Sequence, residues 1–302
     1  MGASSSIFAS DVVPTFYGKR AWPGCPTKKH DWKYPESMIH YIAKNPSSTK
    51  VYQKMIQSGK YFFEKNPVLV VSKLDTCKDN VNSLICSNTV DECKKNTEKC
   101  CVKIDIAKVF SKIWITDKLS VTDGAKNFTS VFCSKLYRCE IDFLGICRKV
   151  IMFDDLLLFT SSAKKILLCD NQIIFNEGKP VMLNTILESS PNVTIFFFYF
   201  DDGASTVNTS LKNIMKLKNL GKIEYFGLHN LSESLSIEDI SAFLKKSEHV
   251  RIEFRFSKNI SDDYKNQLDA LIDEIIESKA FNRLIVYDGQ DREKYKTMKN
   301  RL

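Results

Sequence analysis

The sequence predicts an α/β protein, in which a solenoid of similar strand–turn–helix units with a period of about 29 residues follows a small helical module. Three observations support this fold class. From Ile104 onward, short β-like stretches alternate with helical patterns. Small polar residues end these stretches at nearly constant intervals. The composition, 43% hydrophobic and 26% charged, is that of a globular chain and excludes disorder throughout.

The chain divides into five segments by composition and pattern. Residues 1–103 have 16 Lys and Arg against 9 Asp and Glu, whereas the whole chain has a net charge of +8, so the basic character belongs to the N-terminal third. This asymmetry suggests a separate module there. The expected segments are an irregular arm at 1–33, the helical module at 34–74, a Cys/Lys-rich linker or loop at 75–103, the α/β solenoid at 104–290 and a charged tail at 291–302.

The module after the arm shows the helical period. Pro35 can occupy a first helical turn, and Met38, Ile39 and Ile42 then fall on one face. A second helix, which contains Met55, follows a break that includes a proline. About 40 residues in short helices cannot bury their own apolar face, so such a unit needs a partner.

The segment 75–103 has few large apolar residues among its Lys, Asn, Asp and Ser, which predicts a loop. It also contains five cysteines. Their spacing has no Cys-x-x-Cys pair, and no histidine occurs between His40 and His229, so we predict reduced loop thiols and no metal site. These cysteines are Cys77, Cys86, Cys93, Cys100 and Cys101.

The solenoid region predicts a series of strands with helices between them. The helices are expected at roughly 153–163, 178–190, 206–219, 236–247 and 261–279. The strands are expected at Lys112–Thr116, Leu136–Ile141, Lys165–Cys169, Val193–Phe200, Lys222–Leu228, Val250–Phe256 and Arg283–Tyr287. The apolar run in Val193–Phe200 is interpreted as a core strand covered on both faces.

The repeat is the strongest signal in the sequence. A small polar residue follows each expected strand after the first, and successive positions differ by 29, 30, 29, 29 and 29 residues. Asn and Asp suit a turn, because their short side chains hydrogen-bond exposed backbone groups. The six repeat-turn residues are Asp142, Asn171, Asp201, Asn230, Asn259 and Asp288.

Two units resemble the core pattern of leucine-rich repeats, in which an asparagine follows alternating apolar residues. They are Ile166-x-Leu168-x-x-Asn171 and Phe254-x-Phe256-x-x-Asn259. The alternation of strands and helices implies parallel strands with right-handed connections. The resemblance implies a protein-binding surface. The remaining units match only in part.

Nothing in the sequence indicates catalysis or a cofactor. The acidic pairs, such as Asp154-Asp155 and Asp262-Asp263, lie at turns or helix starts, where capping explains them. The histidines are scattered, and no glycine-rich phosphate loop occurs. We therefore expect no enzyme, no catalytic residue, no cofactor and no metal.

The segment Tyr34–Ile42 resembles the opening of an F-box, which begins with an apolar residue and proline. Met55 and Gly59–Phe62 resemble the second half of that motif. Over about residues 34–290 the chain is similar to the nematode-expanded families that join an F-box-like N-terminus to an F-box-associated, leucine-rich-like region. The resemblance implies binding to the Skp-type adaptor of a cullin ubiquitin ligase through Pro35, Met38, Ile39, Ile42 and Met55.

On this resemblance the chain is a substrate receptor of a ubiquitin ligase, and the solenoid binds a protein target. The alternative is a ligase-independent scaffold or sequestering inhibitor, in which 34–74 is a structural cap. A nucleic-acid partner is not expected, because no aromatic residues are interleaved with the basic ones as in RNA-binding motifs.

The expected compartment is the cytoplasm or the nucleus. No window approaches 18 consecutive apolar residues, and the first 20 residues lack the features of a secretory signal. Ten cysteines in such a chain indicate reduced thiols. The start Met1–Ser6 fits the N-myristoylation pattern, so contact with a membrane is expected only if Gly2 is acylated.

Overall fold

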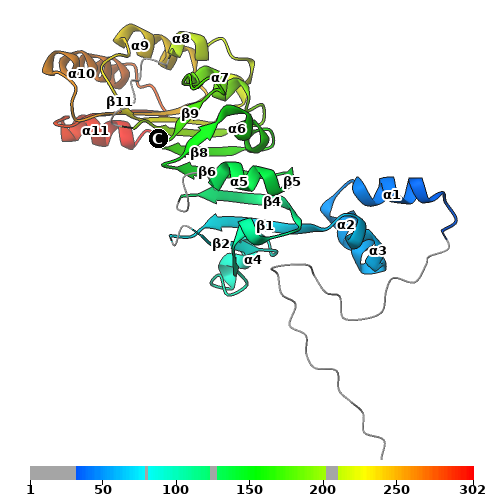
Figure 1. The fold of residues 1–302 in the computed structure, drawn as a ribbon. Coiled ribbons are helices and arrows are strands. Elements are labelled where there is room, and N and C mark those ends of the chain that lie inside the picture. The colour runs from blue at the N-terminus through cyan, green and yellow to red at the C-terminus, as the bar shows by residue number, and fades with distance from the viewer. Residues whose placement is uncertain (1–31, 79–80, 123–127, 202–209) are drawn as a thin grey trace, which may run out of the picture.

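The computed structural model describes residues 32–78, 81–122, 128–201 and 210–302, and these form a mixed α/β fold around one large, mostly parallel sheet (Figure 1). Within the described residues that sheet has eleven strands. The strands of the large sheet are β1 (Val68–Thr76), β2 (Ser83–Cys86), β3 (Val102–Ile104), β4 (Lys112–Val121), β5 (Leu136–Cys139), β6 (Phe143–Cys147), β8 (Lys165–Cys169), β10 (Ile195–Tyr199), β11 (Tyr225–Leu231), β12 (Arg251–Phe256) and β13 (Arg283–Val286). A separate pair is formed by β7 (Val150–Met152) and β9 (Gln172–Ile174).

The helices connect these strands or lie at the ends of the sheet. They are α1 (Glu36–Lys44), α2 (Thr49–Ser58), α3 (Lys60–Lys65), α4 (Val90–Lys95), α5 (Phe128–Lys135), α6 (Phe153–Thr160), α7 (Leu183–Glu188), α8 (Leu211–Ile214), α9 (Ile237–Lys246), α10 (Asp262–Glu277) and α11 (Arg292–Lys299). Ser236 and Ser261 cap α9 and α10 through side-chain hydrogen bonds, as residue types at those positions predict.

The strand order is simple. From β1 the row runs β4, β6, β8, β10, β11, β12 and β13, and every pair of neighbours in it is parallel. Each strand therefore lies beside the one that precedes it in this row, and right-handed connections of that kind place the helices on one face. Figure 1 shows α7, α8, α9 and α10 along the same side of the sheet.

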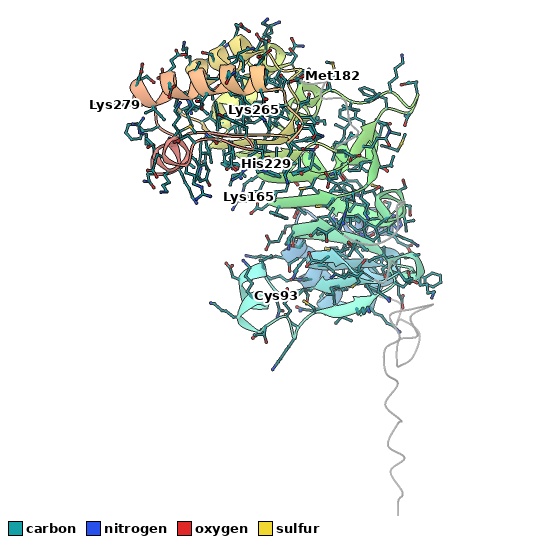
Figure 2. The ribbon with its side chains drawn as sticks, turned by 90° about the vertical axis from the view of Figure 1, so that its left-hand side faces the viewer. Cys93, Lys165, Met182, His229, Lys265 and Lys279 are labelled. Atoms are coloured by element: carbon teal, nitrogen blue, oxygen red, sulfur yellow. The ribbon has the colours of Figure 1, made fainter. Side chains whose placement is uncertain are left out.

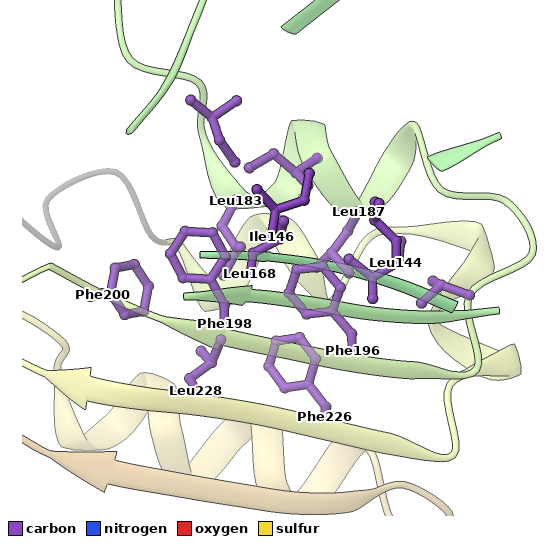
Figure 3. Close-up of a cluster of buried hydrophobic side chains, with 14 of the residues drawn as sticks. Leu144, Ile146, Leu168, Leu183, Leu187, Phe196, Phe198, Phe200, Phe226 and Leu228 are labelled. Carbon is purple, nitrogen blue, oxygen red and sulfur yellow. The ribbon is translucent and has the colours of Figure 1, made fainter. Parts of the chain in front are cut away.

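The core lies between the sheet and these helices. Alternation along β10 turns Phe196 and Phe198 toward the helices, where they are buried, whereas Phe197 faces the other side and is partly exposed. Phe226 of β11 stacks on Phe196, with ring centroids 5.9 Å apart (Figure 3). The expectation that Val193–Phe200 is covered on both faces is therefore wrong, because helices cover one face only along this strand.

Register, and not a constant period, aligns the strands. Phe143 pairs with Lys165, Lys165 with Ile195, and Ile195 with Tyr225, which in turn pairs with Arg251. The units between these register partners span 22, 30, 30 and 26 residues, so the expected period of about 29 residues is approximate and not constant. The connecting helices range in length from four to sixteen residues. The buried apolar face of each strand, and not a constant repeat length, therefore sets the register.

Two of the six predicted repeat-turn residues donate to a backbone carbonyl of the neighbouring strand in the row or of the residue just after that strand, although Asn230 lies within β11 and does not end it. Buried Asn171 donates from Nδ2 to the Ile146 carbonyl at 2.7 Å and accepts from the Lys149 N–H at 3.0 Å. Asn230 adopts a left-handed φ of 60° and donates to the Phe200 carbonyl at 2.9 Å. These side chains satisfy backbone groups where a strand ends.

The other four repeat-turn residues have different surroundings. Asp142 is exposed, lies between β5 and β6 and pairs with Lys164 at 2.9 Å, so it precedes a strand and does not end one. Asp201, Asn259 and Asp288 are exposed. The equal sequence intervals therefore join positions that are not structurally equivalent.

The expected linker at 75–103 is wrong. This segment contains the end of β1, the antiparallel strands β2 and β3, and α4, all at one end of the large sheet. The charged tail at 291–302 contains α11, whose Lys294 pairs with Asp269 and Asp273 of α10 at 2.8 and 2.7 Å.

We predict that Asn171→Ala lowers the free energy of unfolding by about 1–3 kcal/mol, because it leaves a buried carbonyl and a buried N–H without partners. Urea denaturation followed by circular dichroism measures the change. Asn259→Ala is the matched control, since Asn259 is exposed, and it should change stability by less than about 0.5 kcal/mol. Equal losses in both variants would contradict this role of Asn171.

Candidate protein-docking surfaces

The first candidate surface is the outer face of α1. The helix begins after Pro35 and buries Ile39 and Ala43 against the rest of the module. Its other face exposes Met38, Tyr41 and Ile42 at 48%, 68% and 43% of their surfaces. Scattered exposed apolar residues are common, but three neighbours on one short helix form an apolar strip that a partner could cover.

The predicted adaptor residues separate into two groups. Pro35, Met38 and Ile42 are exposed on α1, whereas Ile39 is only 6% exposed and Met55 packs, partly buried, against the same small core. This core also contains Ala43 and Phe62, with Trp32, Ile56 and Tyr61 packed around it. Ile39 and Met55 therefore belong to the core of the module and not to its exposed surface.

Tyr52 of α2 joins the module to the sheet. Its side chain is fully buried beside Val68 of β1 and Trp114 of β4. Its hydroxyl donates to the Asn66 carbonyl at 2.7 Å and accepts from the Val68 N–H at 2.9 Å. Residues that belong to α2 and to the first strand of the row thus share one hydrogen-bonded cluster.

A second contact joins the same two parts. The Tyr137 hydroxyl of β5 donates to the Lys44 carbonyl at the end of α1, at 2.6 Å. The Tyr137 ring lies 5.6 Å from that of Trp114, and the Arg138 guanidinium lies 4.8 Å from the Trp114 ring. The helical module is therefore packed against the sheet.

The second candidate surface is the helix-free face of the parallel sheet. Glu253 of β12 is buried there beneath three polar side chains. It accepts from Tyr225 at 3.0 Å and from Arg255 at 2.6 Å, and it lies 3.0 Å from His229 Nε2. Phe197 adds an aromatic neighbour, with its ring 4.5 Å from that of His229 (Figure 2 labels His229).

These bonds set the charge of Glu253. The hydrogen bond with His229, with further bonds from Arg255 and Tyr225, lowers the pKa of Glu253 to about 2 against the opposing effect of burial. Burial and the neighbouring Glu253 carboxylate raise the pKa of Tyr225 above its ordinary value. This face of the sheet therefore carries the ionised Glu253 carboxylate, which hydrogen-bond donors largely surround.

This cluster is not among the sites that the sequence predicts. The signal that could have found it is the strict alternation of Arg251–Phe256, in which every second residue is polar. Such alternation indicates a strand with one face that no helix covers. Polar side chains on that face of two neighbouring parallel strands lie beside one another when the strands are in register.

The cysteines of 75–103 are also placed differently from the expectation. Four of them, Cys86, Cys93, Cys100 and Cys101, have sulfur atoms that all lie within 4.8 Å of one another. The prediction of separate loop thiols without the form of a metal site is therefore wrong in its geometry. The predicted lipidation residue Gly2 lies outside the described residues.

A comparison with protein-family models, curated proteins and solved structures finds no match for this chain. Among the helices that the structure describes, none has the length and apolar character needed to cross a membrane.

We predict that Tyr52→Phe destabilises the protein by about 1–3 kcal/mol, because the buried Val68 N–H and the Asn66 carbonyl lose a partner. Tyr41→Phe changes an exposed tyrosine in the same module and should be near neutral. Thermal unfolding of both variants measures the difference, and a Tyr52→Phe variant as stable as the control would rule out this anchor.

We predict a dependence on pH from Glu253. Its folded pKa lies below the ordinary value of about 4.3, so it stabilises the fold above that pH, and this stabilisation is lost as the pH falls toward about 2. Glu253→Gln should therefore be less stable than the parent at pH 7, with a gap that narrows as the pH falls through this range. Chemical denaturation at several pH values tests this, with exposed Glu224→Gln as the control.

Proposed function

We propose that the chain is a protein-binding receptor, in which the module α1–α3 docks on the Skp-type adaptor of a cullin ubiquitin ligase and the parallel-sheet region binds a protein target. No catalytic role is part of this proposal, and its setting would be the cytoplasm or the nucleus. The observation that carries it is the apolar strip of Met38, Tyr41 and Ile42, which is exposed on a helix whose sequence resembles an F-box opening.

The position of this strip supports the proposal. Docking helices bind partners through apolar residues at helical spacing, and Met38, Tyr41 and Ile42 have that spacing. Pro35 lies at the start of the same helix and is exposed beside them. A Skp-type adaptor that covers this strip would remove apolar surface from water, which is the main favourable term in association.

The target-binding part of the proposal rests on the sheet. We propose that the row from β4 to β13 is a leucine-rich-repeat-like solenoid, because its strands follow chain order with helices on one face. In such an arrangement the helix-free face is available to a partner. Tyr225, His229 and Arg255, with Phe197 beside them, provide aromatic and charged groups of the kinds that are common in interfaces.

A second candidate function has one specific observation in its favour. The buried cluster of Tyr52, Val68 and Trp114 is what a structural cap would require, since the module then covers the end of the sheet core. On that interpretation the chain is a scaffold or sequestering inhibitor that works without a ligase. The two functions differ in whether an adaptor binds to α1.

The test is co-purification of the full chain with a Skp-type adaptor. Ile42→Asp should weaken binding by about 2 kcal/mol or more, roughly 30-fold, because it places a charge in the centre of the apolar strip. Ile42 is the right position, since aspartate at buried Ile39 would unfold the module instead. Titration by calorimetry gives the affinities.

Leu158→Asp is the matched control. Leu158 lies on helix α6 and is 47% exposed, close to the 43% of Ile42, so the chemical change and the helical setting are alike. The proposal predicts full binding by the control. Binding that survives Ile42→Asp, or no binding by the parent chain, would favour the capped scaffold.

A further inference from the structure

Four cysteines whose spacing in the sequence lacks a metal-ligand pattern lie close together at one end of the sheet. Cys86 is the last residue of β2, and Cys93 lies in α4. Cys100 and Cys101 immediately precede β3, whose Val102 pairs with Ile85 in antiparallel register. Because β3 runs antiparallel to β2, this register places Cys101 opposite Cys86.

The local sequence explains this return. Thr89 and Glu92 form a reciprocal capping box that fixes the start of α4. After the helix, Thr97 and Glu98 adopt left-handed φ values of 49° and 60°, which reverse the chain within two residues. Buried Lys73 of β1 then pairs with the Glu98 carboxylate and secures the turn to the sheet.

The sulfur positions fit one metal ion. The Cys86 and Cys100 sulfurs are 3.2 Å apart, those of Cys93 and Cys101 are 3.4 Å apart, and all four lie within 4.8 Å of one another. Zinc–sulfur bonds of about 2.3 Å in a tetrahedron place the sulfurs roughly 3.8 Å apart. Disulfide sulfurs are only about 2.05 Å apart, so the four positions surround a centre and do not form two bonded pairs.

We propose that Cys86, Cys93, Cys100 and Cys101 bind one zinc ion in a tetrahedral, four-thiolate structural site. Four sulfur donors in this arrangement select zinc among the common divalent ions, because harder ions prefer oxygen. Binding releases the four thiol protons to solvent and forms four zinc–sulfur bonds, with no change of oxidation state. All four ligands come from the protein, so no coordination position is left for a substrate.

Burial and charge support the assignment. Cys86 and Cys93 are buried, whereas Cys100 and Cys101 are partly exposed and provide a route for the ion. The filled site has a net charge of −2. Lys73 of β1 is the register partner of Cys86 of β2, which places a cation beside the site.

The site would also explain how three short elements hold together at this end of the sheet. The ion would join β2, α4 and β3, which are only four, six and three residues long.

The first experiment measures metal content in the full chain, purified under reducing conditions with no chelator. Elemental mass spectrometry should find one zinc per chain. Cys93→Ser should reduce this to background, because serine is a poor zinc ligand. Cys77→Ser is the matched control: Cys77 lies just after β1 in the same segment but outside the four-sulfur cluster, so this variant should keep its zinc.

A second measurement remains decisive if Cys93→Ser fails to fold. Cobalt(II) added to the reduced, metal-stripped parent chain should give the visible bands of tetrahedral thiolate coordination, and zinc should displace them with one equivalent. Zinc should also protect four cysteines from alkylation, which peptide mass spectrometry would assign to Cys86, Cys93, Cys100 and Cys101.

Three outcomes would overturn the proposal. The reduced parent chain could bind neither zinc nor cobalt. Cys77→Ser could lose zinc as fully as Cys93→Ser. The four cysteines could be isolated as disulfides that, once reduced, leave a chain with no metal affinity. None of these outcomes depends on whether an adaptor binds to α1.

Discussion

The structure depends on the pairing of each parallel strand with the one before it in the row, under helices that cover one face only. This pairing requires that alternate side chains of every strand be apolar and that they meet at a common level. Phe196 and Phe226 illustrate the result, because their rings stack at 5.9 Å across two strands. The opposite side chains of the same strands are then free to be polar or aromatic, which is how one sheet supplies both a core and a possible binding face.

The sequence predicted the parts of this arrangement that carry a local signal. Lys165–Cys169 is a strand with the expected bounds, because a short apolar run there ends shortly before the turn residue Asn171. The strand β6 was not expected from the sequence, since Gly145 interrupts its apolar pattern. The equal intervals between the small polar residues were misleading, because Asn171 follows β8, Asn230 lies within β11 and Asp142 precedes β6.

The candidate sites could be predicted from the sequence to a smaller extent than the fold. Apolar periodicity placed Met38 and Ile42 on α1, but it could not separate them from Ile39, which faces inward on the same helix. The cysteine cluster could not be found from spacing, because two left-handed residues and a strand pairing bring its members together. The Glu253 cluster likewise depends on register between β11 and β12, which is a property of the sheet and not of either segment.

The order of the strands also has a consequence for how the chain acquires its fold. Since each parallel strand needs only a strand that has already been synthesised, the sheet can grow from its N-terminal end as the polypeptide leaves the ribosome. The helix α11 emerges after β13, and its Lys294 pairs with two aspartates of α10. Until it docks, the edge strand β13 would present unpaired backbone groups, so the interval between synthesis of β13 and docking of α11 is when a nascent chain would be most exposed to aggregation.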